Sequence, residues 1–513
     1  RRKLLRSSMA EKQKTGNRSG WLYFSIALII LAAVFFFSSR ERLVDPDEGA
    51  YLLAAKLVME GKSVYTDFFW PQMPLLPYAY GAWMKLFGTN WYAARYFSGF
   101  LGMAMGLLLF FHVRRLTGKQ TWGLLSVILF AFSSFSIGWF ATTKTYTLST
   151  FLLFSGYLFL FADRLKDWKY LAAGVFLGLA ISTRLYFFGL IPVFLFLIYR
   201  EERKFGTIGK HALGLLLGLA PSLFFLFKNP DNFYFNNIGY HFLRSDYDFG
   251  SSIGQKIEAI PRLLGVGLTE GFIGLQFAFL LLVSAYLLYA SLRSKQKLPA
   301  LLVITLALPF MLFIPTPTHI QYFSSLAPFL IITLVLLASK LMTNPGRWRT
   351  LFGLALAAYV LVWPFDYHRY SQLGTAVPGV GGGPENAVNW KIETLAAVAR
   401  ALDSHIETDG EPVLAFWPGY LLESKAQTPP KMENHSGVVI SSRLDDAERK
   451  KYRIFSVAQI ADAIAQHRIR LIVFEIWIRE PLRSELLDLM QKSGYERILQ
   501  IGDREIYRWN PVR

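Results

Sequence analysis

Repeated apolar runs long enough to cross a bilayer are the feature that most restricts the fold of this chain. Backbone polar groups inside a bilayer have to be satisfied within their own segment, so such runs form helices. Hydrophobic residues make up 53% of the 513 residues, which fits a membrane protein better than a soluble one. The sequence predicts a polytopic α-helical membrane protein of about eleven spans. We place them at 21–37, 94–112, 121–138, 146–162, 169–183, 186–199, 211–228, 272–292, 299–315, 321–339 and 350–364.

Positive charge predicts which side of the membrane each connection faces. The formal net charge is +18, which in a soluble chain would suggest a nucleic-acid partner. Here basic loops that face anionic cytoplasmic lipid explain it, so we expect no nucleic acid. With the N-terminus inside, every expected inner connection is basic: Arg114, Arg115, Lys119, Arg164, Lys166, Lys169, Arg200, Arg203, Lys204, Lys210, Arg293, Lys295, Lys297, Lys340, Arg347 and Arg349. We predict a multi-pass protein of the plasma (inner) membrane with its C-terminal part outside.

The first 37 residues fit either a retained anchor or a signal peptide. The apolar run is long, and the sequence from Phe35 to Ser39 offers no small-x-small cleavage site. We therefore expect a basic cytoplasmic N-terminus at 1–20, followed by a retained anchor. The chain has no cysteine, which excludes disulfides, thiolate nucleophiles and cysteine-bound metals.

Composition changes after Trp363-Pro364 and predicts a second domain. Residues 21–365 form the expected membrane module, and the glycine-rich stretch within 366–384 is expected to be a flexible linker. Residues 385–513 predict a small extracytoplasmic α/β domain, because helical and short apolar strand patterns alternate. Its expected elements are helices near 389–407, 456–467 and 480–493, strands at 412–417 and 470–475, and a hairpin through Gly502-Asp503.

Two expected outer segments are long, at 40–93 and 229–271. The second is too polar to span a membrane and too aromatic for a plain linker, and it contains His241, Arg244 and Asp246. We expect a partly helical surface segment that orders over a substrate.

The first outer segment contains the acidic sequence Asp45-Pro46-Asp47-Glu48. Asp45 suits an N-cap, proline suits the first helical position, and Glu48 at N3 would complete a capping box. Capping alone could be the whole role of Asp45 and Glu48, but it does not need Asp47. The following run from Tyr51 to Met59 predicts an amphipathic helix along the membrane surface.

Three groups with actual or potential positive charge fall at predicted outer span ends: Lys144, Arg184 and His319. Each alone has a structural explanation, because basic side chains at span ends reach for the headgroups. Together they lie on the same membrane face as Asp47. We therefore expect them to bind one phosphate, while Asp47 acts as general base towards an acceptor hydroxyl. A phosphate leaves without protonation, so a single carboxylate is enough for transfer of a sugar from a lipid phosphate.

At these residues the chain resembles the GT-C glycosyltransferases. Within them it is similar to the family of dolichyl-phosphate-mannose–protein mannosyltransferases and aminoarabinose lipid A transferases, over roughly 20–365. The matching motifs are Asp47-Glu48-Gly49-Ala50-Tyr51, Lys144-Thr145-Tyr146, Thr183-Arg184-Leu185-Tyr186, and His319 with Tyr322 and Pro328. The resemblance implies a polyprenyl-phosphate sugar donor, transfer normally with inversion, and Asp47 as the catalytic carboxylate. The residues then expected to bind substrate are Asp45, Glu48, Tyr51, Lys144, Arg184, His241, Arg244, His319 and Tyr322.

The sequence leaves the sugar and the acceptor open: the acceptor is a lipid, a polysaccharide or a protein. The chain lacks the Trp-Trp-Asp signature of oligosaccharyltransferases, and its outer domain does not resemble the β-trefoil of eukaryotic protein mannosyltransferases. A divalent cation is compatible with Asp45, Asp47 and Glu48, since hard cations prefer carboxylates, but no metal ligand is assigned. The alternatives are a lipid or sugar transporter or flippase, which usually carries charge at the bilayer midplane, and a receptor that uses the C-terminal domain.

Overall fold

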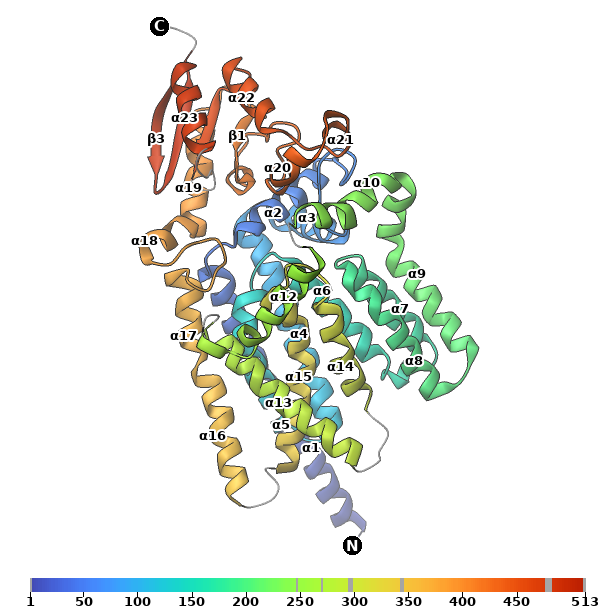
Figure 1. The fold of residues 1–513 in the computed structure, drawn as a ribbon. Coiled ribbons are helices and arrows are strands. Elements are labelled where there is room, and N and C mark those ends of the chain that lie inside the picture. The colour runs from blue at the N-terminus through green and yellow to red at the C-terminus, as the bar shows by residue number, and fades with distance from the viewer. Residues whose placement is uncertain are drawn as a thin grey trace.

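The computed structural model describes residues 2–245, 248–268, 271–293, 299–341, 346–475 and 482–510. Asp246, Lys295 and Lys297 of the predicted loops and the first residues of the helix predicted at 480–493 lie outside these ranges. Figure 1 shows a long helical bundle with a small mixed domain at the end opposite the N-terminus.

A helix lies at each of the expected spans, and the helical membrane architecture with a small C-terminal α/β domain is confirmed. These helices are α1 (Arg2–Glu41), α4 (Trp91–Thr117), α5 (Gln120–Ala131), α6 (Thr145–Phe159), α7 (Trp168–Ile181), α8 (Ile191–Glu202), α9 (Phe205–Lys228), α13 (Phe272–Arg293), α14 (Ala300–Leu312), α15 (Ala327–Leu341) and α16 (Arg347–Leu361). Within the described residues, six helical segments are long and apolar enough to cross a membrane by themselves. The number of spans and the side of each end therefore stay predictions.

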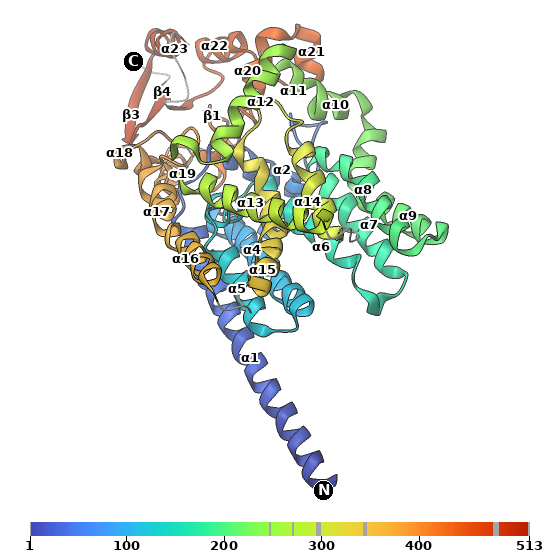
Figure 2. The same cartoon turned by 60° about the horizontal axis from the view of Figure 1, so that its bottom comes forward.

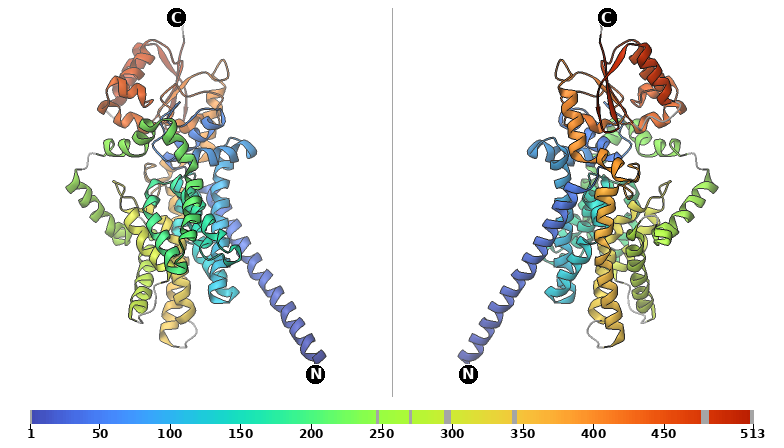
Figure 3. Two further views of the ribbon diagram at one scale, coloured as in Figure 1. Left: turned by 90° about the vertical axis from the view of Figure 1, so that its right-hand side faces the viewer. Right: turned by 90° about the vertical axis from the view of Figure 1, so that its left-hand side faces the viewer.

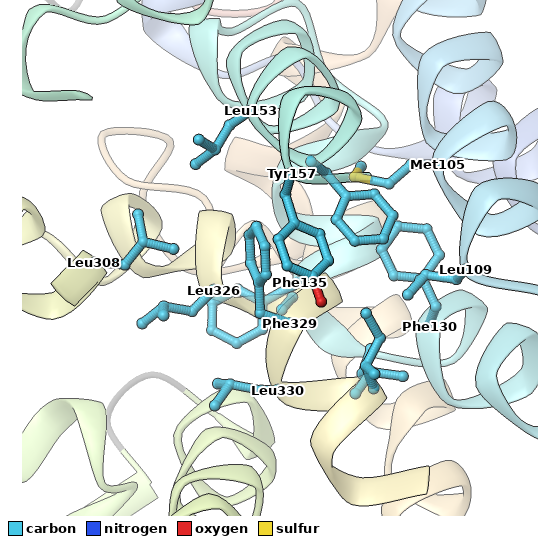
Figure 4. Packing of buried hydrophobic residues seen from close by; sticks show 14 of the residues in the cluster. Met105, Leu109, Phe130, Phe135, Leu153, Tyr157, Leu308, Leu326, Phe329 and Leu330 are labelled. Atoms are coloured by element: carbon cyan, nitrogen blue, oxygen red, sulfur yellow. The ribbon is translucent and has the colours of Figure 1, made fainter. Parts of the chain in front are cut away.

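The bundle core is built from large apolar and aromatic side chains. Figure 4 shows Phe130, Phe135 and Phe329 packed with Met105 and Leu109, all fully buried. Helix α15 supplies much of this core. The apolar segment Ile320–Lys340, which contains most of α15, is 94% buried over its 18-residue apolar stretch, so it forms the centre of the bundle. Small residues let other helices approach more closely, as at the α7–α9 contact, where a Cβ on Gly178 would meet the backbone of Gly218 at 2.8 Å.

Short helices of the two outer segments lie between the bundle and the C-terminal domain (Figures 1 and 3). The first segment forms α2 (Pro46–Met59) and α3 (Leu75–Phe87). The second forms α10 (Pro230–Tyr234), α11 (Tyr240–Leu243) and α12 (Phe249–Leu263). The partly helical second segment agrees with the sequence-based expectation.

Helix α2 differs from the predicted amphipathic surface helix. Its residues from Gly49 to Ala55 are all buried, because the C-terminal domain packs against the side that the sequence pattern leaves to solvent. Even Lys56 is used inside this contact, where its ammonium donates to the carbonyls of Leu421 and Ser424 at 2.9 and 2.8 Å. The helix is therefore enclosed between two layers of protein.

The C-terminal domain contains a four-stranded mixed sheet. Helices pack on this sheet (Figures 1 and 2). The strand order is β1-β2-β4-β3, with β1 and β2 parallel and the other neighbours antiparallel. The first two strands are apolar and buried throughout, as expected for a parallel pair covered on both faces. The elements are α19 (Ile392–Asp403), β1 (Val413–Ala415), α20 (Ser436–Ile440), α21 (Asp446–Lys451), α22 (Val457–Ala465), β2 (Leu471–Phe474), α23 (Leu482–Lys492), β3 (Tyr495–Ile501) and β4 (Arg504–Trp509).

The stretch predicted as a linker packs between the two parts. Val377 and Val380 are buried in the apolar cluster that also contains Leu43 and Trp390. This cluster joins the outer segments to the C-terminal domain without a break, so the domain is attached through side-chain packing as well as through the chain.

Candidate functional site

A cavity of about 650 Å³ lies where the bundle, both outer segments and the C-terminal domain meet. Of the residues predicted from the sequence, seven line it: Asp47, Tyr51, Arg184, His241, Arg244, His319 and Tyr322. Asp45, Glu48 and Lys144 lie behind its wall. The structure thus brings together residues from α2, from the segment after α7, from the second outer segment and from the connection between α14 and α15.

The predicted capping box at the start of α2 is present. The backbone N–H of Asp45 donates to Glu48 Oε1 at 2.8 Å, and Asp45 Oδ1 accepts from the backbone N–H of Asp47 at 3.1 Å. Because both flanking carboxylates are used in this turn, Asp47 at N2 is the acid that projects into the cavity, with its side chain half-exposed. This agrees with the sequence-based division of roles.

Glu48 has a second partner that the sequence analysis did not identify. Arg95, at the start of α4, binds both of its carboxylate oxygens, with Nη2–Oε1 at 2.6 Å and Nε–Oε2 at 3.0 Å. The backbone N–H of Thr143 donates to Oε2 at 2.9 Å. Glu48 and Arg95 are fully buried, so Glu48 positions the helix start and does not reach the cavity. Its predicted contact with substrate is not supported by this placement.

Lys144 pairs with two acids of the turn, a contact that the sequence did not predict. Its ammonium lies 2.8 Å from Asp45 Oδ1 and 2.9 Å from Asp47 Oδ2, and it is almost fully buried. The rings of Trp139 and Tyr146 flank it at 5.5 and 5.9 Å. Two of its three N–H donors therefore bind carboxylates, and Lys144 holds Asp47 in place. Its contact with a donor phosphate stays a prediction.

The charge state of Asp47 follows from this neighbourhood. Burial alone would raise its pKa, but the ammonium of Lys144, with smaller contributions from His435 and Arg244, lowers the pKa of Asp47 to about 2. The carboxylate is therefore ionised at neutral pH, which a general base has to be before it accepts a proton.

Two arginines supply positive charge to the cavity. The guanidinium of Arg184 stands over the rings of Tyr146, Tyr186 and Tyr322 at 4.6, 5.5 and 5.5 Å. Arg244, from the second outer segment, places its guanidinium carbon 5.8 Å from the centroid of the Tyr240 ring. The aromatic rings fix both guanidinium groups, so they can offer planar donor sets to an oxyanion.

The two predicted histidines of the cavity are neutral rather than cationic. Burial, followed by the positive charges of Lys144 and Arg244, lowers the pKa of His319 to about 4. Burial and the neighbouring arginines lower the pKa of His241 to about 3. Both imidazoles can therefore hydrogen-bond to a ligand but do not add charge at neutral pH.

The carboxylates of this region are committed to cations of the protein. The residues described by the structure contain no group of three or more histidine or acidic side chains arranged to hold a metal ion. Asp45 and Asp47 share Lys144, and Glu48 is bound by Arg95. We therefore assign no metal ligand here.

Three residues of this region were not predicted from the sequence: Arg95, Arg42 and His435. Arg95 is an ionisable residue at an outer span end, the same signal that selected Lys144, and it could have been found in that way. Arg42 supports the same turn, with Nη1 3.8 Å from Glu48 Oε1. His435 lines the cavity from the C-terminal domain, together with Asn434 and Ser436, and no local motif marks it.

The chain resembles known proteins in sequence and in fold. The sequence model of the family described as dolichyl-phosphate-mannose-protein mannosyltransferase matches residues 71–226. No curated protein sequence matches the chain significantly. Among solved structures, ArnT from Cupriavidus metallidurans bound to undecaprenyl phosphate superimposes with a TM-score of 0.64 at 14% identity, covering 96% of this chain and 100% of that chain. ArnT from the same organism in the apo state gives a TM-score of 0.62 at 14% identity, covering 97% and 100%.

These similarities confirm the resemblance to the GT-C glycosyltransferases. The fold likeness also extends further than the sequence motifs indicated, because it includes the C-terminal domain as well as residues 20–365.

Proposed function

We propose that this chain is a membrane glycosyltransferase that moves a sugar from a polyprenyl-phosphate donor to an acceptor hydroxyl at the outer face of the inner membrane. The observation that supports it best is the presence in one cavity of an ionised carboxylate, Asp47, and two ring-supported guanidiniums, Arg184 and Arg244. The similar ArnT structure is bound to undecaprenyl phosphate, which suggests a carrier of this class.

The reaction that fits this arrangement is a single displacement. Asp47 takes the proton from the acceptor hydroxyl as its oxygen bonds to the anomeric carbon. The bond between that carbon and the phosphate oxygen breaks, and its electron pair stays on the phosphate. Arg184 and Arg244 stabilise the growing charge there, and the configuration at the anomeric carbon inverts.

The cavity position suits a lipid-linked donor. It lies at the end of the bundle next to the C-terminal domain, where aromatic side chains can receive the first part of a prenyl chain while the phosphate meets the arginines. Figure 3 shows the short helices of the two long connecting segments at this end. The opposite end of the molecule carries the basic connections, which the positive-inside rule assigns to the cytoplasm.

The test compares envelope lipids and glycans of a strain lacking this gene with the same strain carrying the wild type or Asp47→Asn. Mass spectrometry should find a sugar that disappears on deletion, returns with the wild type and stays absent with Asp47→Asn. Full return with Asp47→Asn would contradict the proposal and favour a transporter, which does not need this base.

A further inference from the structure

The wall of the cavity that belongs to the C-terminal domain has a different chemistry from the bundle side. The bundle side carries Arg184 among tyrosines, whereas the loop from Asn434 to Ser436 presents an amide, an imidazole and a hydroxyl. Burial lowers the pKa of the His435 imidazole although the charge of Asp47 opposes this, so the ring is neutral at neutral pH. A neutral imidazole has one donor and one acceptor nitrogen.

Apolar packing with both outer segments fixes this loop. The loop runs into helix α20, which begins at Ser436. Ile440, at the end of this helix, belongs to a buried cluster with Phe69, Phe235 and Tyr240. Ser436 and Tyr240 line the cavity together. The loop is therefore a built part of the cavity.

Aromatic and polar contacts strengthen the same interface. The rings of Phe235 and Tyr452 stack with centroids 3.5 Å apart and planes at 2°. Lys451 pairs with Asp231 at 2.8 Å, and Asn232 Nδ2 donates to the carbonyl of Tyr65 at 2.8 Å. Three segments far apart in sequence thus form one roof over the cavity.

The C-terminal domain also contacts the turn that carries Asp47. The indole Nε1 of Trp417 donates to the carbonyl of Pro46 at 2.6 Å, one residue before the base. Gly49 lies against the same ring, where a Cβ would come within 2.7 Å of two indole carbons. The domain therefore sets both the position of Asp47 and the surface that faces it.

Several other residues that line the cavity are neutral hydrogen-bonding groups. Besides the Asn434–Ser436 loop, the cavity is lined by Gln72, Asn237 and Gln321. A single isolated hydroxyl does not need so many partners, whereas a ring with several hydroxyls does. In an inverting displacement, the acceptor enters beside the base and opposite the leaving phosphate, so in our assignment Arg184 on the bundle side serves the donor and the Asn434–Ser436 loop serves the acceptor.

We propose that the Asn434–Ser436 loop is the acceptor-binding wall, that the acceptor is a carbohydrate hydroxyl, and that His435 is a specificity-determining residue that hydrogen-bonds to it. This rests on the proposed function, because it assigns the second substrate of the same cavity. A serine or threonine side chain of a protein is the competing acceptor.

The first experiment uses undecaprenyl phosphate as the binding probe with purified full-length protein. His435→Phe should leave the Kd for this lipid within about twofold of wild type, since the acceptor wall does not touch the phosphate. Arg184→Ala should weaken it by at least about tenfold, the loss of one charge-assisted hydrogen bond. If Arg184→Ala binds normally, the proposed function fails. If only His435→Phe weakens binding, the assignment of His435 fails.

The second experiment measures transfer in the deletion strain, with thermal unfolding of each purified variant alongside. His435→Phe fills the space without hydrogen-bonding and should reduce the product by about tenfold or more. His435→Gln keeps a donor and an acceptor and should stay within about threefold of wild type. The matched control is His405→Gln, in the same domain but outside the cavity lining. Equal yields from His435→Phe and wild type, equal losses in both His435 variants, or a product found on protein instead of on a glycan or glycolipid would overturn the proposal.

Discussion

Arg95 and Glu48 form a buried two-point ion pair across 47 residues of sequence, at 2.6 and 3.0 Å. The pair joins the start of α4 to the first turn of α2. Arg95 also donates to the carbonyl of Leu43 at 3.0 Å. One side chain therefore binds both the residues that precede the turn and the turn itself. The position of Asp47 in the cavity thus depends on two residues that do not line it.

Replacing Arg95 should therefore destabilise the whole site. Arg95→Leu leaves the buried Glu48 without its two-point partner and only the more distant Arg42 guanidinium at 3.8 Å, and we expect the free energy of unfolding to fall by roughly 3–5 kcal/mol. Thermal unfolding in detergent is the measurement. Glu41→Gln, which removes an exposed pair with Arg40, is the control and should change stability by less than about 1 kcal/mol. A small effect of Arg95→Leu would show that the pair does not hold the turn.

Asp47→Asn should remove the base while keeping the shape of the side chain. Turnover should fall by roughly 10²–10⁴-fold, the range for loss of general-base catalysis. The Kd for undecaprenyl phosphate should change little, because the arginines bind the phosphate. A transfer assay on purified variants, with thermal stability measured beside it, separates catalysis from folding. Near-normal turnover would remove Asp47 from the mechanism.

Asp45→Ala should cost stability more than catalysis. Loss of an N-cap alone costs about 1 kcal/mol. The structure adds the buried contact with Lys144 at 2.8 Å, so we expect the loss to exceed that of a cap. Ser456→Ala, which removes an N-cap side chain of α22 away from the cavity, provides the comparison for capping alone. Equal losses in the two variants would mean that the Lys144 contact contributes nothing.

The pH dependence should depend on Lys144. Asp47 has a pKa lowered to about 2, so it is ionised across the accessible range, and any stability from its pairing is present above its ordinary pKa and lost only as pH falls through about 2. In Lys144→Met, burial remains and the main opposing charge is gone, so the pKa of Asp47 should rise. The acid limb of the kcat/KM profile should then move upward into the measurable range, while wild type shows none from Asp47. An unchanged profile would contradict the coupling of these two residues.

Gly49→Ala tests the contact between α2 and the C-terminal domain. The added methyl group would lie 2.7 Å from the Trp417 ring and 2.8 Å from Gly419 Cα, so helix or ring has to move. We expect reduced turnover and a lower unfolding temperature. Gly209→Ala in α9, where a Cβ meets nothing within 4 Å, should be neutral or slightly stabilising. Identical behaviour of the two variants would show that this close approach is not needed.

Sequence patterns predicted those features of the structure that depend on interactions between residues close in sequence. Hydropathy located the helices, and the acidic motif predicted the capping box with Asp47 left over, because both depend on neighbours within a few residues. The partner of Lys144 could not be read in this way: Asp45 lies 99 residues away, and the same lysine at a span end could equally face a phosphate. His435 lies in a domain whose docking surface has no sequence signature. The enclosure of α2 was missed for the same reason, since its cover comes from Trp417 and Gly419.

The hydrogen bond from Trp417 to Pro46 joins residues 371 positions apart. At cellular elongation rates of about 5–20 residues per second, the carboxylate of Asp47 is synthesised roughly 20–70 s before the indole that fixes its turn. During that interval the bundle can be inserted and folded, but its reaction centre is incomplete. Under the proposed function, transfer therefore begins only after the C-terminal domain has docked, so a half-made chain cannot consume the lipid-linked sugar pool.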